Sequence, residues 1–111
     1  RQRQMCIRDS CATGGASVDK MQGGSDWKKR YDAKFPGQFQ IYSPYAYDAA
    51  MVLADAMKRA NSVDPKVFTP SLAKTEHKGV TANIAFTAKG ELTTPAVTLY
   101  TFKDGGRVAL N

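Results

Sequence analysis

The spacing of apolar residues predicts a short amphipathic helix in the first third of the chain. Trp27, Tyr31 and Phe35 recur every four residues, so they share one face of a helix. Ser25 is placed to cap its first backbone amides, and Pro36-Gly37 ends it. We therefore expect a helix that docks onto its neighbours through aromatic side chains.

A second and stronger helical pattern begins at Ser43-Pro44 and continues to about Ala60. Ser43 is expected to cap this helix, because proline is favoured at the first helical position. Asp48 and Asp55 are expected on its other, polar faces, with Asp55 forming an i,i+4 ion pair with Arg59. The predicted apolar stripe consists of Tyr45, Ala49, Val52, Leu53, Ala56, Met57 and Ala60.

Weaker patterns flank this helix. Gln38 to Tyr42 alternates in part and predicts a short strand or an extended segment. Asp64-Pro65 begins a further helical region, in which Pro70 is expected to separate two short pieces. Leu72 and Ala73 would anchor the second piece to the core.

Beyond Gly79 the apolar period changes to two, which is typical of strands. Val80 to Phe86 and Val97 to Lys103 alternate in this way, and Ala88 to Glu91 forms a turn between them. Asp104 to Gly106 is a hairpin signal that leads into Arg107 to Leu110. The pattern thus predicts helices followed by a small antiparallel group of strands.

The composition of the 111 residues is that of an ordinary globular protein, with 42% hydrophobic and 23% charged residues. No stretch approaches the roughly 20 apolar residues that a membrane-spanning helix needs. The net charge is +6, but the positive residues are scattered and only Lys28, Lys29 and Arg30 cluster. Asp26 and Asp32 alternate with this cluster, so we interpret it as a solvated helix face and expect no nucleic-acid partner.

Residues that would support metal or covalent chemistry are sparse. Cys6 and Cys11 lie close together and could form only a disulfide that closes a very short loop, whereas the single His77 is far from both. His77 is expected on an exposed loop. The sequence lacks a phosphate-binding loop, a dinucleotide fingerprint and a paired-carboxylate arrangement. We therefore expect no metal, no cofactor and no enzymatic activity.

The first residues differ from the rest. Arg1 to Ser10 shows neither helical nor strand periodicity, and it resembles translated adapter read-through at the end of an assembled sequencing contig. A genuine disordered basic arm is the alternative. Ala12 to Gly24 is rich in small residues and predicts a linker or loop. On this basis residues 1–16 are set apart as a non-native or disordered start, and residues 17–111 are treated as the folded part.

Five segments, taken together and in order, resemble one known family. Tyr31 to Phe35 is similar to its "Y-x-A-K-F" helix, and Tyr42 to Ala49 to its "Y-x-P-Y-A-Y-D-A" helix start. Ala56 to Ser62 resembles the end of that helix, Gly79 to Glu91 the "G-V-T-G-x-I-x-F-D-x-K-G-D" segment, and Thr98 to Lys103 the last strand. The family is that of the periplasmic leucine/isoleucine/valine-binding proteins, which serve branched-chain amino-acid ABC transporters.

The sequence departs from the family pattern at three places. Ala82 stands where the family usually has Gly, Thr87 where it often has Asp, and Glu91 where Asp is common. These residues lie in the predicted strand and its turn, so they affect local backbone geometry only.

The resemblance implies the C-terminal portion of a type I periplasmic-binding fold, an α/β fold of two lobes that close over a ligand. It also implies a periplasmic protein that binds an amino acid and delivers it to a membrane permease. An aromatic residue just before the "Y-D-A" helix packs on the ligand in this family, and Tyr42 occupies that position. Ser43 could add a hydroxyl or serve only as a cap, and Tyr45 could join the wall or the core.

Two other functions stay open at this point. A ligand sensor of the same fold would bind amides, urea or aromatic acids. A basic interaction module would bind a macromolecule through Lys28, Lys29 and Arg30, and its affinity would fall steeply with salt.

Overall fold

The computed structural model describes residues 10–110. Its elements fall into two compact units, which are described separately. The middle unit comprises residues 18–94. The terminal unit comprises the described residues before 18 and after 94, so the chain leaves this unit and returns to it.

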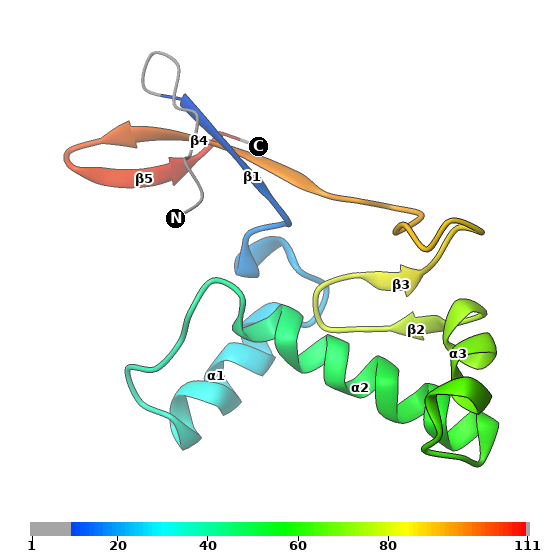
Figure 1. Ribbon diagram of the computed structural model, residues 1–111. Helices are drawn as coiled ribbons and strands as arrows, with labels where there is room; N and C mark the ends of the chain where they lie inside the picture. The colour runs from blue at the N-terminus through cyan, green and yellow to red at the C-terminus, as the bar shows by residue number, and fades with distance from the viewer. Residues whose placement is uncertain (1–9, 111) are drawn as a thin grey trace. The chain divides into compact units, whose positions relative to one another are not determined.

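The middle unit contains three α-helices (Figure 1): α1 (Gly24–Lys34), α2 (Ser43–Ala60) and α3 (Pro65–Ala73). A 3₁₀ turn at Val18–Lys20 precedes α1. Helix α3 folds back and packs against α2. The aromatic face predicted for the first helix is confirmed, because the Trp27 ring is buried against the start of α2.

The two predicted serine caps are wrong. The first helical hydrogen bond of α1 joins the Trp27 N–H to the Gly23 carbonyl, so α1 begins before Ser25. Gly24 fits there because a Cβ would lie only 2.0 Å from the Val18 carbonyl oxygen. Ser43 is already the first residue of α2, and its hydroxyl accepts the Gln40 N–H at 3.0 Å.

Helix α2 ends as predicted. Asn61 adopts the left-handed conformation with φ 51°, and its N–H and that of Ser62 bond back to the last turn. The Asp55–Arg59 ion pair is confirmed at 2.8 Å. The segment before α2, Gln38 to Tyr42, contains no strand.

Helix α3 differs from the prediction at its proline. Asp64 caps it by accepting the Lys66 N–H at 2.9 Å, as expected, but the helix runs through Pro70 without a break. Pro70 is exposed, so the carbonyl that loses its helical donor can bind water instead. The buried anchor of α3 is Phe68, whereas Ala73 is exposed.

A short hairpin completes the middle unit: β2 (Glu76–Lys78) pairs with β3 (Asn83–Ala85) in antiparallel register, with His77 opposite Ile84. The strand predicted from Val80 to Phe86 is therefore shorter, because its first residues form the connection. His77 lies on a strand and is half-buried, so its predicted loop position was wrong. No apolar alternation marks β2, which is polar at all three positions.

The terminal unit is a three-stranded antiparallel sheet in the order β1-β4-β5 (Figure 1). Strand β4 (Val97–Lys103) and the hairpin to β5 (Gly106–Ala109) confirm the prediction. Thr98 and Tyr100 are buried on one face, and the Arg107 guanidinium lies 4.5 Å from the centre of the Tyr100 ring.

Strand β1 (Ser10–Gly14) corrects the loop predicted from Ala12 onward. Its residues are small and carry no period, and the strand forms because β4 supplies backbone partners along its whole length. The Thr98 hydroxyl then donates to the Gly15 carbonyl at 2.7 Å. Buried Cys11 is disulfide-bonded. The non-native origin proposed for the start stays a prediction, and residues 1–9 lie outside the described part.

Candidate functional site

The residues predicted to contact a ligand meet at the start of α2. Tyr42 holds the N-cap position and its side chain is 55% exposed. The ring of Tyr45, one turn into the helix, lies edge-on to it with 6.4 Å between ring centres. The structure therefore brings Tyr42 and Tyr45 together and leaves the Tyr42 ring open to a partner, while Ser43 bonds to the backbone before the helix.

A cluster of aromatic rings holds α1 against this helix start. Trp27, which is 5% exposed, stacks on Tyr31 at 4.9 Å between ring centres and tilts against Tyr47 at 5.7 Å. Phe39, from the loop between the helices, meets both Trp27 and Tyr31 edge-on. Such pairs add attraction beyond the burial of their surface. The cluster fixes the loop that carries Tyr42.

An open groove of about 770 Å³ runs beside the cluster, between α1 and the first turns of α2. Of the three predicted ligand residues, only Ser43 lines it. The charged residues that line the groove are Arg30 and Lys34, and no acidic side chain lines it. We call it the aromatic groove; it is lined by Trp27, Arg30, Tyr31, Ala33, Lys34, Phe35, Ser43, Ala46 and Tyr47.

A polar cluster centres on Asp48, for which the sequence predicted a solvated position. Asp48 is only 2% exposed. Its Oδ1 accepts the Val80 N–H at 2.9 Å, and its Oδ2 accepts the Thr81 N–H at 2.8 Å and the Thr81 hydroxyl at 2.6 Å. The carboxylate thus binds the two middle residues of the connection between β2 and β3, and we call this set of bonds the Asp48 clamp.

The clamp leaves no room for a larger residue at Gly79. A Cβ there would lie 2.5 Å from Asp48 Oδ2, which is far below a normal contact distance. The Gln22 side-chain amide donates to the Gly79 carbonyl at 2.6 Å. One helix residue and one residue before α1 therefore fix the same turn.

The sequence held two signals for the clamp. Pro44, Asp48, Val52 and Ala56 are spaced four apart, and all four are buried, so they form the inward stripe of α2. The predicted stripe shares Val52 and Ala56 with it, but its other members Ala49 and Leu53 are exposed. The second signal is that the two segments resembling "Y-D-A" and "G-V-T" are the two sides of the clamp.

The described residues offer little for other chemistry. Within residues 10–110, no three His, Cys, Asp or Glu side chains come together in a way that would hold a metal ion. Among the helices of this same part, none combines the length and apolar character needed to cross a membrane.

A family profile and several solved structures match this chain. The family profile described as periplasmic binding protein matches residues 13–107. A search of curated proteins gives no match. Among solved structures, a leucine-binding protein from Thermotoga maritima aligns with a TM-score of 0.76 at 22% identity, over 92% of this chain and 29% of its own.

An ABC transporter substrate-binding protein from Desulfitobacterium hafniense aligns with a TM-score of 0.75 at 20% identity, over 91% of this chain and 30% of its own, and a structure of such a protein from the same organism in complex with Leu aligns with the same values. The chain therefore spans less than a third of the length of these structures. They confirm the fold class predicted from the sequence, a portion of the type I periplasmic-binding fold.

Proposed function

The chain belongs to the periplasmic binding protein family, and from this premise we propose that it forms part of the substrate-binding component of an ABC transporter. The proposed ligand is a branched-chain or related amino acid, captured as two lobes close over it. The observation that carries the proposal is the exposed ring of Tyr42, held ready at the start of α2 inside the family match.

Tyr42 fits the role of an apolar wall. An aliphatic side chain gains most by contact with a large flat ring that is already fixed in place, because little entropy is then lost on binding. The T-shaped contact with Tyr45 and the cap position in α2 restrict Tyr42. Tyr42 is 55% exposed, so about half of the residue's surface is open to a ligand.

The other two residues take supporting roles. Tyr45 is half-buried and contacts the Tyr42 ring edge-on. Ser43 fixes the loop through its bond to the Gln40 N–H, so a direct contact of its hydroxyl with the ligand is the weaker assignment. Groups for the ligand carboxylate and ammonium would come from the remainder of a two-lobed protein.

The proposal involves no chemical step. The family is one of binding proteins, and we assign this chain no catalytic residue. The protein would only deliver the ligand to a membrane permease. It would be located outside the cytoplasmic membrane.

Isothermal titration of the full-length protein with leucine, isoleucine and valine tests the assignment. Tyr42→Ala should weaken binding by about tenfold or more, the loss typical of an aromatic anchor. Tyr42→Phe keeps the ring and should retain affinity. Phe102→Ala removes another exposed ring, which lies in the terminal unit, and should leave affinity unchanged.

Other results would redirect the proposal. A response to amides, urea or aromatic acids in place of amino acids would keep the fold and support the sensor. A folded protein with no response to any of these compounds would contradict a solute-binding function and favour the interaction module.

A further inference from the structure

We propose that Asp48 is a positioning residue for the ligand wall: its clamp on the β2–β3 connection fixes the start of α2, and thereby holds the Tyr42 ring in place for an amino acid. The inference rests on the proposed function and adds a residue to it. Asp48 is buried, so it acts through Tyr42 and does not touch the ligand. The clamp therefore contributes to ligand affinity as well as to stability.

Two attachments hold the first two turns of α2, and both lie within six residues of Tyr42. Tyr47 packs against the Trp27 ring of α1, and its neighbour Asp48 bonds to the β2–β3 connection. Because neighbouring residues of a helix point about 100° apart, the two attachments act on different sides of α2. The start of α2 is thus restrained in both rotation and translation.

The clamp restrains α2 more sharply than apolar packing does. Of the four buried residues of α2, only Asp48 carries a polar side chain; the others are Pro44, Val52 and Ala56. Apolar burial is non-directional, so it tolerates small rotations of a helix. The three hydrogen bonds to the carboxylate, of 2.9, 2.8 and 2.6 Å, weaken steeply when they are misaligned. Fixing the register of two elements is the best-attested role of such a buried group.

The position of α2 passes directly to Tyr42. The Tyr42 carbonyl accepts the Ala46 N–H at 3.0 Å, which ties its backbone to the first turn. Its ring lies edge-on to Tyr45, which belongs to the same turn. Both contacts come from the two turns that Asp48 holds, so a shift of α2 at the clamp moves the Tyr42 ring with it.

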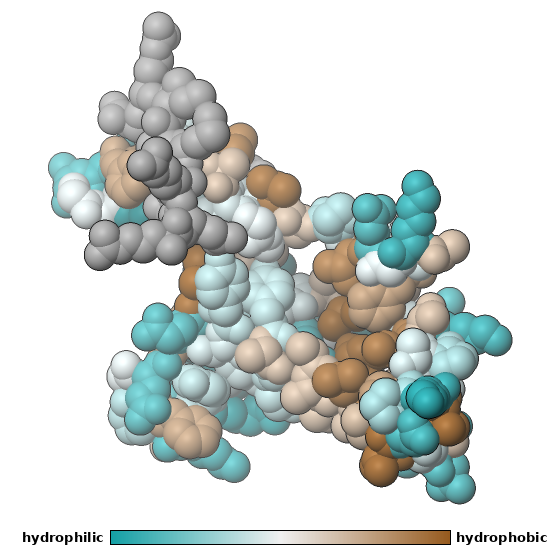
Figure 2. All heavy atoms as spheres, viewed as in Figure 1, coloured by the Kyte–Doolittle hydropathy of each residue, from teal (hydrophilic) through white to brown (hydrophobic). Residues whose placement is uncertain are grey.

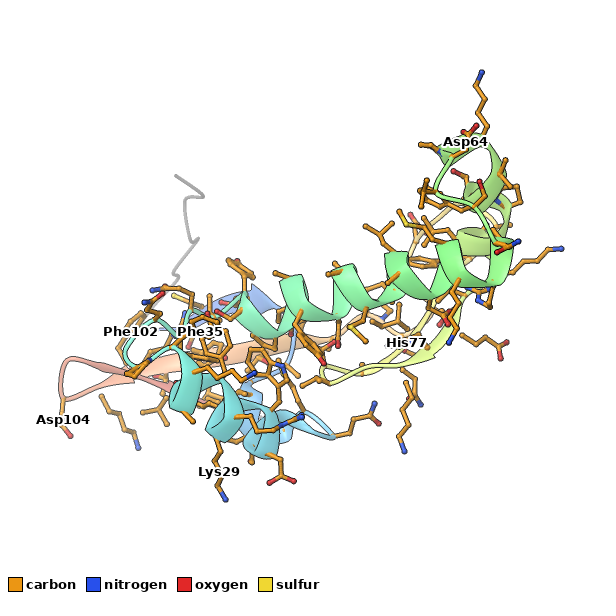
Figure 3. All side chains as sticks on the ribbon, turned by 90° about the horizontal axis from the view of Figure 1, so that it is seen from below. Lys29, Phe35, Asp64, His77, Phe102 and Asp104 are labelled. Carbon is orange, nitrogen blue, oxygen red and sulfur yellow. The ribbon has the colours of Figure 1, made fainter. Side chains whose placement is uncertain are left out.

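A clamp positions a helix only if its other side is fixed, and the β2–β3 connection meets this condition. Gln22 donates to the Gly79 carbonyl at 2.6 Å, and the Gly79 N–H donates to the Ala82 carbonyl at 3.0 Å. The pairing of β2 with β3 closes the hairpin on either side of this turn. In Figure 3 the hairpin, marked by His77, runs alongside α2.

Calorimetric titration of the full-length protein with leucine tests the inference. Asp48→Asn keeps the size of the side chain but replaces one acceptor oxygen by an NH₂ group that faces a donor. It should weaken leucine binding by about fivefold at a temperature well below the unfolding midpoint, which circular dichroism locates. In a Tyr42→Ala background the same substitution should change affinity by less than about twofold, because the ring that Asp48 positions is gone.

Thr81→Val tests the clamp from its other side and decides the question even if Asp48→Asn does not fold. It removes the hydroxyl that donates to Asp48 at 2.6 Å and leaves the backbone N–H groups in place. Leucine binding should weaken by about threefold. Thr81→Ser keeps a hydroxyl and should recover most of this loss.

A destabilised control separates positioning from stability. Phe68 is the buried anchor of α3. In Figure 3, Asp64 marks the start of α3 at one end of α2, whereas Phe35 lies near the other end, where α2 begins. Phe68→Leu should lower the unfolding midpoint and change leucine affinity by less than about twofold.

Three results would overturn the inference: unchanged affinity in every folded clamp variant, an equal loss with and without the Tyr42 ring, or an equal loss in Phe68→Leu. Failure of the proposed function gives a different pattern. The unaltered protein would then bind none of leucine, isoleucine and valine, or Tyr42→Ala would leave affinity unchanged, and the inference would fall with its premise. A loss in Tyr42→Ala without a loss in the clamp variants would refute the positioning role alone.

Discussion

Each of the two units is stabilised internally by a different kind of contact. In the middle unit, single side chains join segments that are far apart in sequence: Asp48 binds the β2–β3 connection and Trp27 joins α1 to α2. In the terminal unit, the sheet depends on backbone pairing of β4 with both neighbours. A few side-chain contacts thus stabilise the middle unit, whereas the terminal unit depends mainly on hydrogen bonds between the backbones of its strands.

The two units also differ in where they expose apolar surface. The sheet of the terminal unit buries Cys11, Thr98 and Tyr100, but much of its apolar surface stays open. In the middle unit, hydrophobic residues reach the surface over α3 and the β2–β3 hairpin (Figure 2). Apolar surface of this kind commonly marks contacts with further protein. In the terminal unit, the exposed apolar side chains are Val97, Leu99, Phe102, Val108 and Leu110.

The largest effect should come from breaking the Asp48 clamp. Asp48→Ala leaves the N–H groups of Val80 and Thr81 without their acceptor in a place that water reaches poorly. We expect a loss of about 3 kcal/mol in the free energy of unfolding, the upper range for unsatisfied buried donors. Urea unfolding followed by circular dichroism measures it.

Asp55→Ala is the matched control, two turns further along the same helix. It removes the same charge but breaks only a partly exposed ion pair with Arg59. Such pairs contribute less than about 1 kcal/mol. Equal losses in the two variants would show that Asp48 acts only through its charge on the helix, and the clamp would then have no special role.

The sequence predicted those elements whose pattern lies within a single segment of the chain. The helices followed from apolar spacing within one segment, and α2 ends within a residue of its expected position. Strand β1 could not be found in this way, because its residues are small and its partner β4 lies more than eighty residues later. Strand β2 is short and polar, so alternation gave no signal for it.

The candidate site was predicted in part for the same reason. A resemblance at the level of motifs placed Tyr42 at the start of α2. Its exposure there depends only on the local segment that contains it. Asp48 was assigned to solvent because an acidic residue on a helix is usually exposed. Its burial depends on donors from residues 80 and 81, and no property of α2 alone reveals them.

A smaller effect should follow from a methyl group placed inside the clamp. Gly79→Ala would put a Cβ 2.5 Å from Asp48 Oδ2, which forces the turn or the carboxylate to move. We expect a loss of about 2 kcal/mol, typical of overpacking at a buried site. In an Asp48→Ala background the clash with the carboxylate is gone and the close contact that remains is with the Ala82 carbonyl oxygen at 3.0 Å, so the same substitution should cost less than about 1 kcal/mol more. Additive losses in this double-mutant cycle would contradict the contact.

The smallest effect should lie in the terminal unit, at its hairpin. Asp104 and Gly105 link β4 to β5 with φ of 50° and 75°, the arrangement of a type I′ turn that matches the twist of the strands. Gly105→Ala should cost about 1 kcal/mol, because a Cβ is strained at positive φ. Gly106→Ala, one residue on, meets only an ordinary contact at 3.5 Å and should change stability by less than about 0.5 kcal/mol. If Gly105→Ala cost as much as Asp48→Ala, the turn would control this sheet as strongly as the clamp controls the middle unit, and the contrast between the two units would fail.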